Sequence, residues 1–134
     1  MKPMFSTTIC AALLAVGSFA HAEIPLPTEK GIKDAIAALS PSYDDVRPNG
    51  SCKAPAGTDQ IVCANKTLAL MDELSAKAYV FAIENASKSE VDHSRTRDVK
   101  WIRGTRNKCK TEACLIGALI EHTNDSLGGE SPYR

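Results

Sequence analysis

The chain has 134 residues, enough for one small domain, and its 16 Lys and Arg residues balance its 16 Asp and Glu residues. This balance excludes a strong overall attraction to nucleic acid or to an anionic membrane. Aromatic residues make up only 5% of the chain, so the core holds few large side chains, and we expect covalent cross-links to support it.

Residues 1–22 have the pattern of a signal peptide. Lys2 precedes an apolar run over residues 9–20, and Ala20-His21-Ala22 matches an A-x-A cleavage site. The run is too short to span a membrane, and an uncleaved N-terminal anchor is the alternative. Cleavage after Ala22 would discard Cys10 and leave an even number of four cysteines. We therefore expect an exported protein, periplasmic or secreted, without a membrane span once the signal is removed.

Residues 23–50 are predicted to form an N-terminal arm with one short helix. Pro25 and Pro27 favour an extended start, and a helix can open at Thr28. One face of this helix is apolar, formed by Ile32, Ala35, Ile36 and Leu39. Prolines and Gly50 then break regular structure. The sequence leaves open whether the arm packs on the rest of the chain or hangs as a linker.

Residues 51–127 are predicted to form a helical domain that begins with two helices. Thr58 or Asp59 can cap a short helix that runs through Cys63, and Asn65 can cap a long helix that starts at Lys66. Apolar residues recur there at intervals of three and four: Leu68, Met71, Leu74, Ala78, Phe81 and Ala82. The i,i+4 pair Glu73 and Lys77 is expected on the exposed side, and the helix should end between residues 85 and 89.

Two more helices are expected to follow. Ser89-Glu90-Val91-Asp92 resembles a capping box that opens a mostly polar helix. Thr111 can cap a final helix that runs to Leu127 and stops at Gly128-Gly129. The fold class is therefore all-α, a small antiparallel helical hairpin with a third packed helix, followed by a flexible tail at residues 128–134.

The four remaining cysteines, Cys52, Cys63, Cys109 and Cys114, allow three disulfide connectivities. Geometry favours the local pairs Cys52–Cys63 and Cys109–Cys114, because each brackets a helix start where the chain must turn. On a straight helix the last two cysteines would lie about 140° apart, so their bond requires a turn at residues 110–111. Zinc is the alternative, but the spacings lack a tight knuckle, and we expect no metal and no cofactor.

The sequence shows no catalytic constellation, so we predict that the protein is not an enzyme. His93 and His122 are isolated and are interpreted as solvated helical histidines. Asp72 and Glu73 are adjacent, so on a helix their side chains diverge, and a solvated face is the simpler interpretation. Arg95, Arg103 and Arg106 would lie within about 80° of one another on one helix. That basic stripe is either a solvated face or a surface for an anionic partner.

About two thirds of the chain after the signal peptide, from Cys52 to Asn124, resembles the N-terminal domain of LprI-type lysozyme inhibitors, which are small bacterial envelope proteins. The matching residues are Cys52, Ile61-Val62-Cys63-Ala64-Asn65, Leu68-x-x-Met71-Asp72, Tyr79, Trp101-x-x-x-x-Arg106-x-x-Cys109 and Cys114-Leu115. The resemblance implies a helical, disulfide-bonded module in which Leu68, Asp72, Tyr79, Trp101 and Arg106 are structural. It also implies lysozyme inhibition as a candidate activity.

Two hypotheses of function follow. In the first, an exported envelope protein inhibits lysozyme or a related wall-degrading enzyme by non-covalent occlusion, with the Cys52–Cys63 loop entering the cleft. Because c-type lysozymes are basic, acidic residues near this loop, Asp59 and Asp72 first, are the candidate contacts. In the second, an interaction module binds an anionic envelope partner through Arg95, Arg103 and Arg106. The oligomeric state is not predicted.

Overall fold

The computed structural model describes residues 28–134, and the expected signal peptide at residues 1–22 lies outside the described residues. All regular secondary structure within 28–134 is helical, so the predicted all-α fold class is confirmed. The elements are α1 (Glu29–Leu39), α2 (Thr58–Ala64), α3 (Lys66–Ser87), α4 (Val99–Gly104), η1 (Arg106–Lys108), α5 (Glu112–Leu127) and η2 (Gly128–Glu130). None of the described helices combines the length and the apolar character needed to cross a bilayer.

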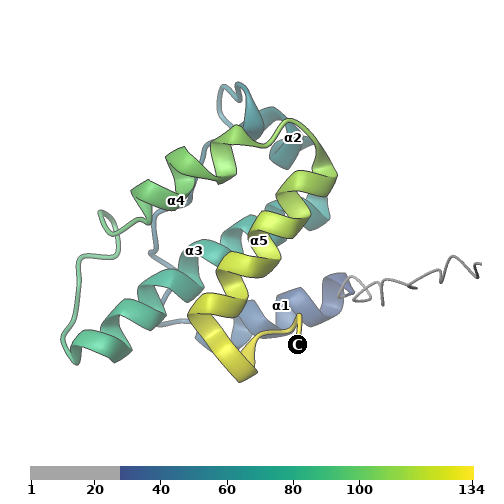
Figure 1. Ribbon diagram of the computed structural model, residues 1–134. Helices are drawn as coiled ribbons and strands as arrows, with labels where there is room; N and C mark the ends of the chain where they lie inside the picture. The colour runs from purple at the N-terminus through teal and green to yellow at the C-terminus, as the bar shows by residue number, and fades with distance from the viewer. Residues whose placement is uncertain (1–27) are drawn as a thin grey trace, which may run out of the picture.

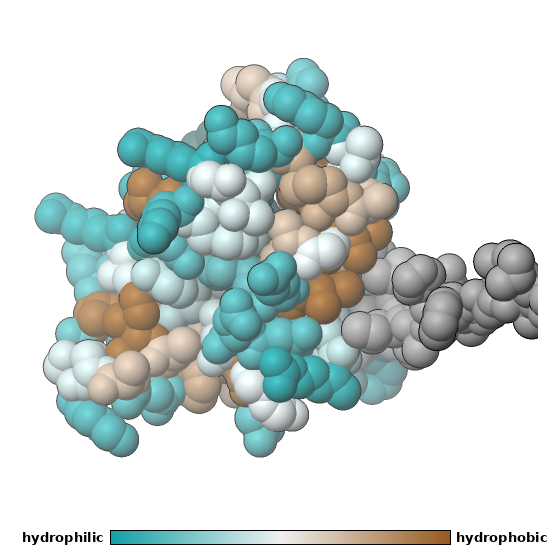
Figure 2. Space-filling model, in the orientation of Figure 1, coloured by the Kyte–Doolittle hydropathy of each residue, from teal (hydrophilic) through white to brown (hydrophobic). Residues whose placement is uncertain are grey.

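The long helices α3 and α5 pack side by side and run in the same direction (Figure 1). Asn65 at the start of α3 donates to Glu112 at the start of α5, and Ser75 meets His122 near the middle of both helices. The chain returns between them through residues 88–104, which run back along α3 and end in α4 (Figure 1). The core lies between α1, α3 and α5 and is formed mainly by Ile32, Leu68, Met71, Leu74, Leu115 and Leu119. On the face shown in Figure 2, hydrophilic residues dominate and apolar residues form small separate groups.

The N-terminal arm packs on the domain, which answers the question that the sequence left open. The Thr28 side chain caps α1 by accepting from the Gly31 N–H, and Ile32 and Leu39 on the predicted apolar face are buried. Glu29 forms a 3.2 Å ion pair with Lys66, which fixes the start of α1 beside the start of α3.

Helix α3 begins where the sequence predicts, because the Asn65 side chain accepts from the backbone N–H groups of Thr67 and Leu68. The predicted Glu73–Lys77 pair forms at 3.1 Å, but its expected exposure is wrong for the lysine. Only 8% of the Lys77 side chain is exposed, because Asp44 from the segment after α1 lies on its other side, 3.5 Å away. The cap predicted for α2 is also wrong, since α2 starts after Gly57 and Thr58 is its first residue.

The helix predicted to start at Ser89 does not form, and the chain has no regular structure from there to Asp98. Asp92 accepts hydrogen bonds from the N–H and hydroxyl of Ser94, so it closes a local turn instead of a capping box. Tertiary contacts also hold this loop, since the Arg47 N–H donates to the His93 carbonyl. The helix begins only at Val99, as α4, where Asp98 is the N-cap and its side chain accepts from the Trp101 N–H.

Both predicted disulfides are present, with Cα–Cα distances of 5.7 Å for Cys52–Cys63 and 5.4 Å for Cys109–Cys114. The second spans the predicted turn, after which the Thr111 side chain caps α5 by accepting from the Cys114 N–H. Two local disulfides of this kind are typical of proteins that fold in an oxidising compartment.

The C-terminal residues are packed, which contradicts the expectation of a flexible tail at 128–134. Helix α5 ends at Gly128, whose φ of 57° is a conformation that glycine adopts without strain. The chain then turns back, and Tyr133 is only 3% exposed within the core cluster. A single aromatic residue six positions after the end of α5 thus anchors the terminus.

Candidate functional site

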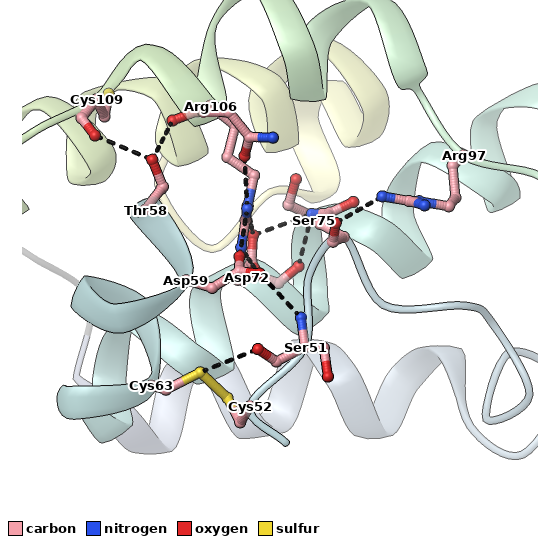
Figure 3. A network of polar contacts seen from close by, with 12 residues as sticks. Ser51, Cys52, Thr58, Asp59, Cys63, Asp72, Ser75, Arg97, Arg106 and Cys109 are labelled. Atoms are coloured by element: carbon pink, nitrogen blue, oxygen red, sulfur yellow. Dashed lines mark hydrogen bonds and ion pairs between the residues drawn. A yellow bond between two sulfur atoms is a disulfide. The ribbon is translucent and has the colours of Figure 1, made fainter. Parts of the chain in front are cut away.

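Arg106 is the centre of a buried ionic network and is only 1% exposed. Its Nε and Nη2 donate to the two carboxylate oxygens of Asp72 at 2.9 and 2.8 Å, a bidentate arrangement, while Nη1 donates to Asp59 at 2.8 Å (Figure 3). Burial opposes the charge of Arg106, but the hydrogen bonds to Asp72 and Asp59 outweigh it and raise its pKa. The network ties α2 and α3 to the segment that leads into α5.

This network explains why three predicted contact residues are not available to a partner. Asp72 and Arg106 are buried, and their side chains hydrogen-bond to each other. Their prediction as partner-binding residues is therefore wrong. The prediction that Asp72 and Glu73 lie on a solvated face is wrong for Asp72, for the same reason. Asp59 keeps 25% of its side chain exposed, but its carboxylate is held between Arg106 and the Ser51 N–H. The structural role that the family resemblance implies for Asp72 and Arg106 fits this geometry.

The same carboxylates position the segment that precedes the first disulfide, residues 47–53. Asn49 is buried and donates through Nδ2 to the Oδ1 atom and the backbone carbonyl of Asp72. Gly50 approaches Asp59 so closely that a Cβ there would lie 2.1 Å from its carboxylate oxygen, so only glycine fits. Buried anchors on one side of the segment leave its other side facing solvent.

A hollow of about 900 Å³ lies beside this segment. Residues from four parts of the chain line it: Arg47, Pro48, Asn49, Gly50, Ser51, Cys52, Lys53, Asp59, Arg97, Arg106 and Asn107. Four of these are cations and one is a carboxylate. We call it the basic hollow.

Arg97 enters the basic hollow from the loop before α4 and is held by one hydrogen bond, from Nη2 to the Asn49 carbonyl at 2.7 Å (Figure 3). Its Nε is covered and has no hydrogen-bond partner among the described residues. Burial, followed by repulsion from Arg47 and Arg106, lowers the pKa of Arg97.

Exposed carboxylates gather on the adjoining surface, which we call the acidic face: Asp44, Asp45, Glu73, Glu90 and Asp92. Asp45, Glu90 and Asp92 line a hollow of about 520 Å³, while Asp44 and Glu73 line a second one of about 350 Å³ that reaches Pro48. Pro48 also lines the basic hollow. The two surfaces of opposite charge therefore meet along the segment before the first disulfide.

His93 lies at the edge of the acidic face and is not the isolated solvated histidine that the sequence suggested. Its Nδ1 is 2.8 Å from Asp45 and its Nε2 is 2.6 Å from Glu84, and only 14% of its side chain is exposed. The hydrogen bond to Asp45, helped by Glu84, outweighs burial and raises the pKa of His93. Tyr43 stacks on the ring and donates to the same Glu84.

His122 is buried between α3 and α5, so its prediction as solvated is also wrong. Its ring stacks on Trp101 at a centroid distance of 3.8 Å and lies 3.0 Å from Asp98 through Nε2. Burial lowers the pKa of His122, although Asp98 opposes this. The neutral ring donates to Asp98 and accepts from Ser75 Oγ at 2.6 Å. Ser75 is fully buried, so this serine, histidine and aspartate arrangement joins α3, α5 and the loop before α4 and does not expose the serine hydroxyl.

The basic stripe predicted for one helix face does not exist. Arg95 lies in a turn and pairs with Asp92, Arg103 is exposed on α4, and Arg106 is buried in η1. The continuous helix that would align them is interrupted at both ends of α4. No sequence motif marks Arg47, Asn49 or Arg97 as site residues. Only the fold brings them together, because the contacts join positions about 50 residues apart.

Comparison with known proteins adds no relative. No family model matches the chain, and neither the curated proteins nor the solved structures contain a significant match.

Proposed function

We propose that the protein is an exported binding protein of the bacterial envelope that inhibits lysozyme or a related wall-degrading enzyme by non-covalent occlusion. The observation that carries the proposal is the acidic face beside a disulfide-anchored loop. A basic enzyme is attracted to such a face, and the attraction both speeds association and orients the two proteins. The motif resemblance to LprI-type inhibitors supports the same partner.

The loop closed by Cys52–Cys63 is the element that we propose to enter the enzyme's cleft. Residues 53, 54, 56 and 57 at its tip are exposed, while Cys52 and the Ser51 N–H hold its start against α2. A loop fixed at both ends loses little conformational entropy on binding, which favours occlusion of a cleft.

The acidic face replaces Asp59 and Asp72 as the surface to test. We expect the double variant Asp45→Asn/Glu90→Gln to weaken inhibition of c-type lysozyme about tenfold at low salt, because it removes two exposed charges from this face. The matched control is Glu121→Gln/Glu130→Gln, which removes two exposed charges elsewhere on the surface. Inhibition is measured by titrating the oxidised protein against lysozyme-driven lysis of bacterial walls.

Two results would overturn the proposal. Absence of inhibition by the unaltered protein at high molar excess would remove lysozyme as the partner. Equal weakening by both double variants would mean that overall charge matters and that the acidic face does not. The proposal would be supported if only Asp45→Asn/Glu90→Gln weakened inhibition, and if the difference between this variant and the unaltered protein became smaller when salt is added.

A further inference from the structure

The basic hollow has a surplus of positive charge that the fold does not neutralise. Four cations line it, while only Asp59 on its wall and Asp72 behind Arg106 oppose them. Arg106 is fully occupied by these two carboxylates. The charges of Arg47, Lys53 and Arg97 therefore face the hollow, and among residues 28–134 no carboxylate forms an ion pair with them.

Arg97 is the clearest example of a cation in this hollow whose charge is not compensated. The guanidinium makes one hydrogen bond to a neutral carbonyl, and its Nε has no partner in the described part of the chain. A partly buried guanidinium is normally satisfied by a carboxylate, a phosphate or several carbonyl groups. A neighbouring arginine, Arg47, adds repulsion instead of compensation.

We infer that the basic hollow is a binding site for a ligand carrying a doubly charged oxyanion group, a carboxylate pair or a phosphate. Arg47 and Arg97 would each offer a planar donor fork, the geometry that recognises oxyanions, and Lys53 would add a mobile charge at the rim. The size of about 900 Å³ suits a small molecule or the end of a larger one. This site is separate from the acidic face and does not depend on a lysozyme partner.

The backbone that forms one wall of the hollow is held in place by other parts of the fold. The buried Asn49 and the close approach of Gly50 to Asp59 fix the backbone of residues 47–53, and the Cys52–Cys63 disulfide fixes its end. A site that is already ordered loses little entropy when the ligand binds. The opposing wall carries Arg97, which the same segment holds through the Asn49 carbonyl.

The test uses isothermal titration calorimetry of the oxidised protein with two probes, pyrophosphate for the phosphate source and citrate for the carboxylate source. We expect at least one probe to bind at low salt, and Arg47→Gln and Arg97→Gln each to weaken it tenfold or more. Arg95→Gln is the matched control, because Arg95 is exposed two residues from Arg97 and lies outside the hollow. The pattern of probes that bind assigns the oxyanion class.

A second readout separates binding from loss of fold. Arg47 contributes its backbone N–H to the fold, which the substitution leaves in place, so Arg47→Gln should unfold at an unchanged temperature. In the unaltered protein the probe should shift the NMR signals of the Arg97 Nε–H and of the Ser51 amide. The inference is overturned if neither probe binds, or if Arg95→Gln weakens binding as much as Arg47→Gln does.

Discussion

Arg106 holds two carboxylates that the sequence suggests as surface residues, Asp72 in the core and Asp59 at its edge. Its guanidinium is buried and bidentate with Asp72, while Asp59 completes the network from α2. Taking such charges out of water is costly, and the cost is met only while both partners are present. The network therefore acts as a specific clamp that fixes how α2 and α3 meet the chain before α5.

We predict that Asp72→Ala lowers the free energy of unfolding by about 3–5 kcal/mol, because it leaves Arg106 buried with incomplete compensation. Asp59→Ala should cost less, since Asp59 is 25% exposed and water can take its place. Urea unfolding of the oxidised variants measures both. The double variant Asp72→Ala/Arg106→Met should recover most of the loss, and a failure to recover would show that the charge of Arg106 is not the cause.

The two histidines give opposite dependences of stability on pH. Burial lowers the pKa of His122 in the fold, whereas an unfolded histidine titrates near 6.5. Below this pH the unfolded chain binds a proton at His122 that the folded protein does not bind. The contribution of His122 to stability is therefore lost as the pH falls below about 6.5. The hydrogen bond to Asp45 raises the pKa of His93, so its contribution is present below about 6.5 and is lost as the pH rises through the folded value.

We therefore predict that His122→Gln removes the decline in stability that begins as the pH falls below about 6.5, even though the variant is less stable throughout. His93→Gln is the control and should instead remove the decline on the alkaline side. Urea unfolding at a series of pH values measures the slopes. A His122→Gln protein that keeps the acidic slope of the unaltered protein would show that another group is responsible.

At the scale of elements, the C-terminal turn contributes to the core through Tyr133. Its ring is buried, but its hydroxyl has no hydrogen-bond partner within the described residues. We predict that Tyr133→Ala lowers the free energy of unfolding by about 3–5 kcal/mol, the cost of emptying an aromatic site. Tyr133→Phe should be neutral or slightly stabilising, because it removes a buried unpaired hydroxyl. Chemical unfolding distinguishes the two, and an unaffected Tyr133→Ala would mean that the tail frays.

The sequence predicts the helices whose signals are local. Regular apolar spacing defines α1, α3 and α5, and the structure confirms the predicted start of α1 at Thr28 and the predicted caps at Asn65 and Thr111. The loop before α4 is missed because Asp92 prefers the hydrogen bonds of Ser94, a local competition that the capping-box pattern does not reveal.

The candidate site is less predictable, because its contacts join distant parts of the chain. A charged residue is normally solvated, so the burial of Arg106 and Asp72 could be inferred only from their pairing across 34 positions. Arg97 meets Asn49 across 48 positions, and neither residue lies in a motif. The disulfides were predictable because their partners are close in sequence and the chain must turn between them.

At the scale of the whole molecule, charge is separated although it sums to zero. The acidic face and the basic hollow meet along the segment before the first disulfide, so one chain presents two surfaces with different preferences. A neutral protein of this kind is not steered by its net charge but by local fields, which salt screens over about 10 Å. Both proposed activities should therefore weaken as ionic strength rises.

The two disulfides should differ in what their loss affects. In the entropy model, the separations of 11 and 5 residues give about 3 kcal/mol for Cys52–Cys63 and about 2 kcal/mol for Cys109–Cys114. Cys52–Cys63 also anchors the segment shared by the acidic face and the basic hollow. We predict that Cys52→Ala/Cys63→Ala weakens both lysozyme inhibition and oxyanion binding, measured under conditions where the variant stays folded.

The variant Cys109→Ala/Cys114→Ala provides the comparison. It should lose stability in urea unfolding but keep both activities, because its cysteines lie at the entry to α5 and outside the lining of all three hollows. Equal functional losses in the two variants would mean that the disulfides act only through overall stability. A loss confined to the first would show that this bond orders the binding surfaces themselves, which is the role that its position beside Gly50 and Asp59 requires.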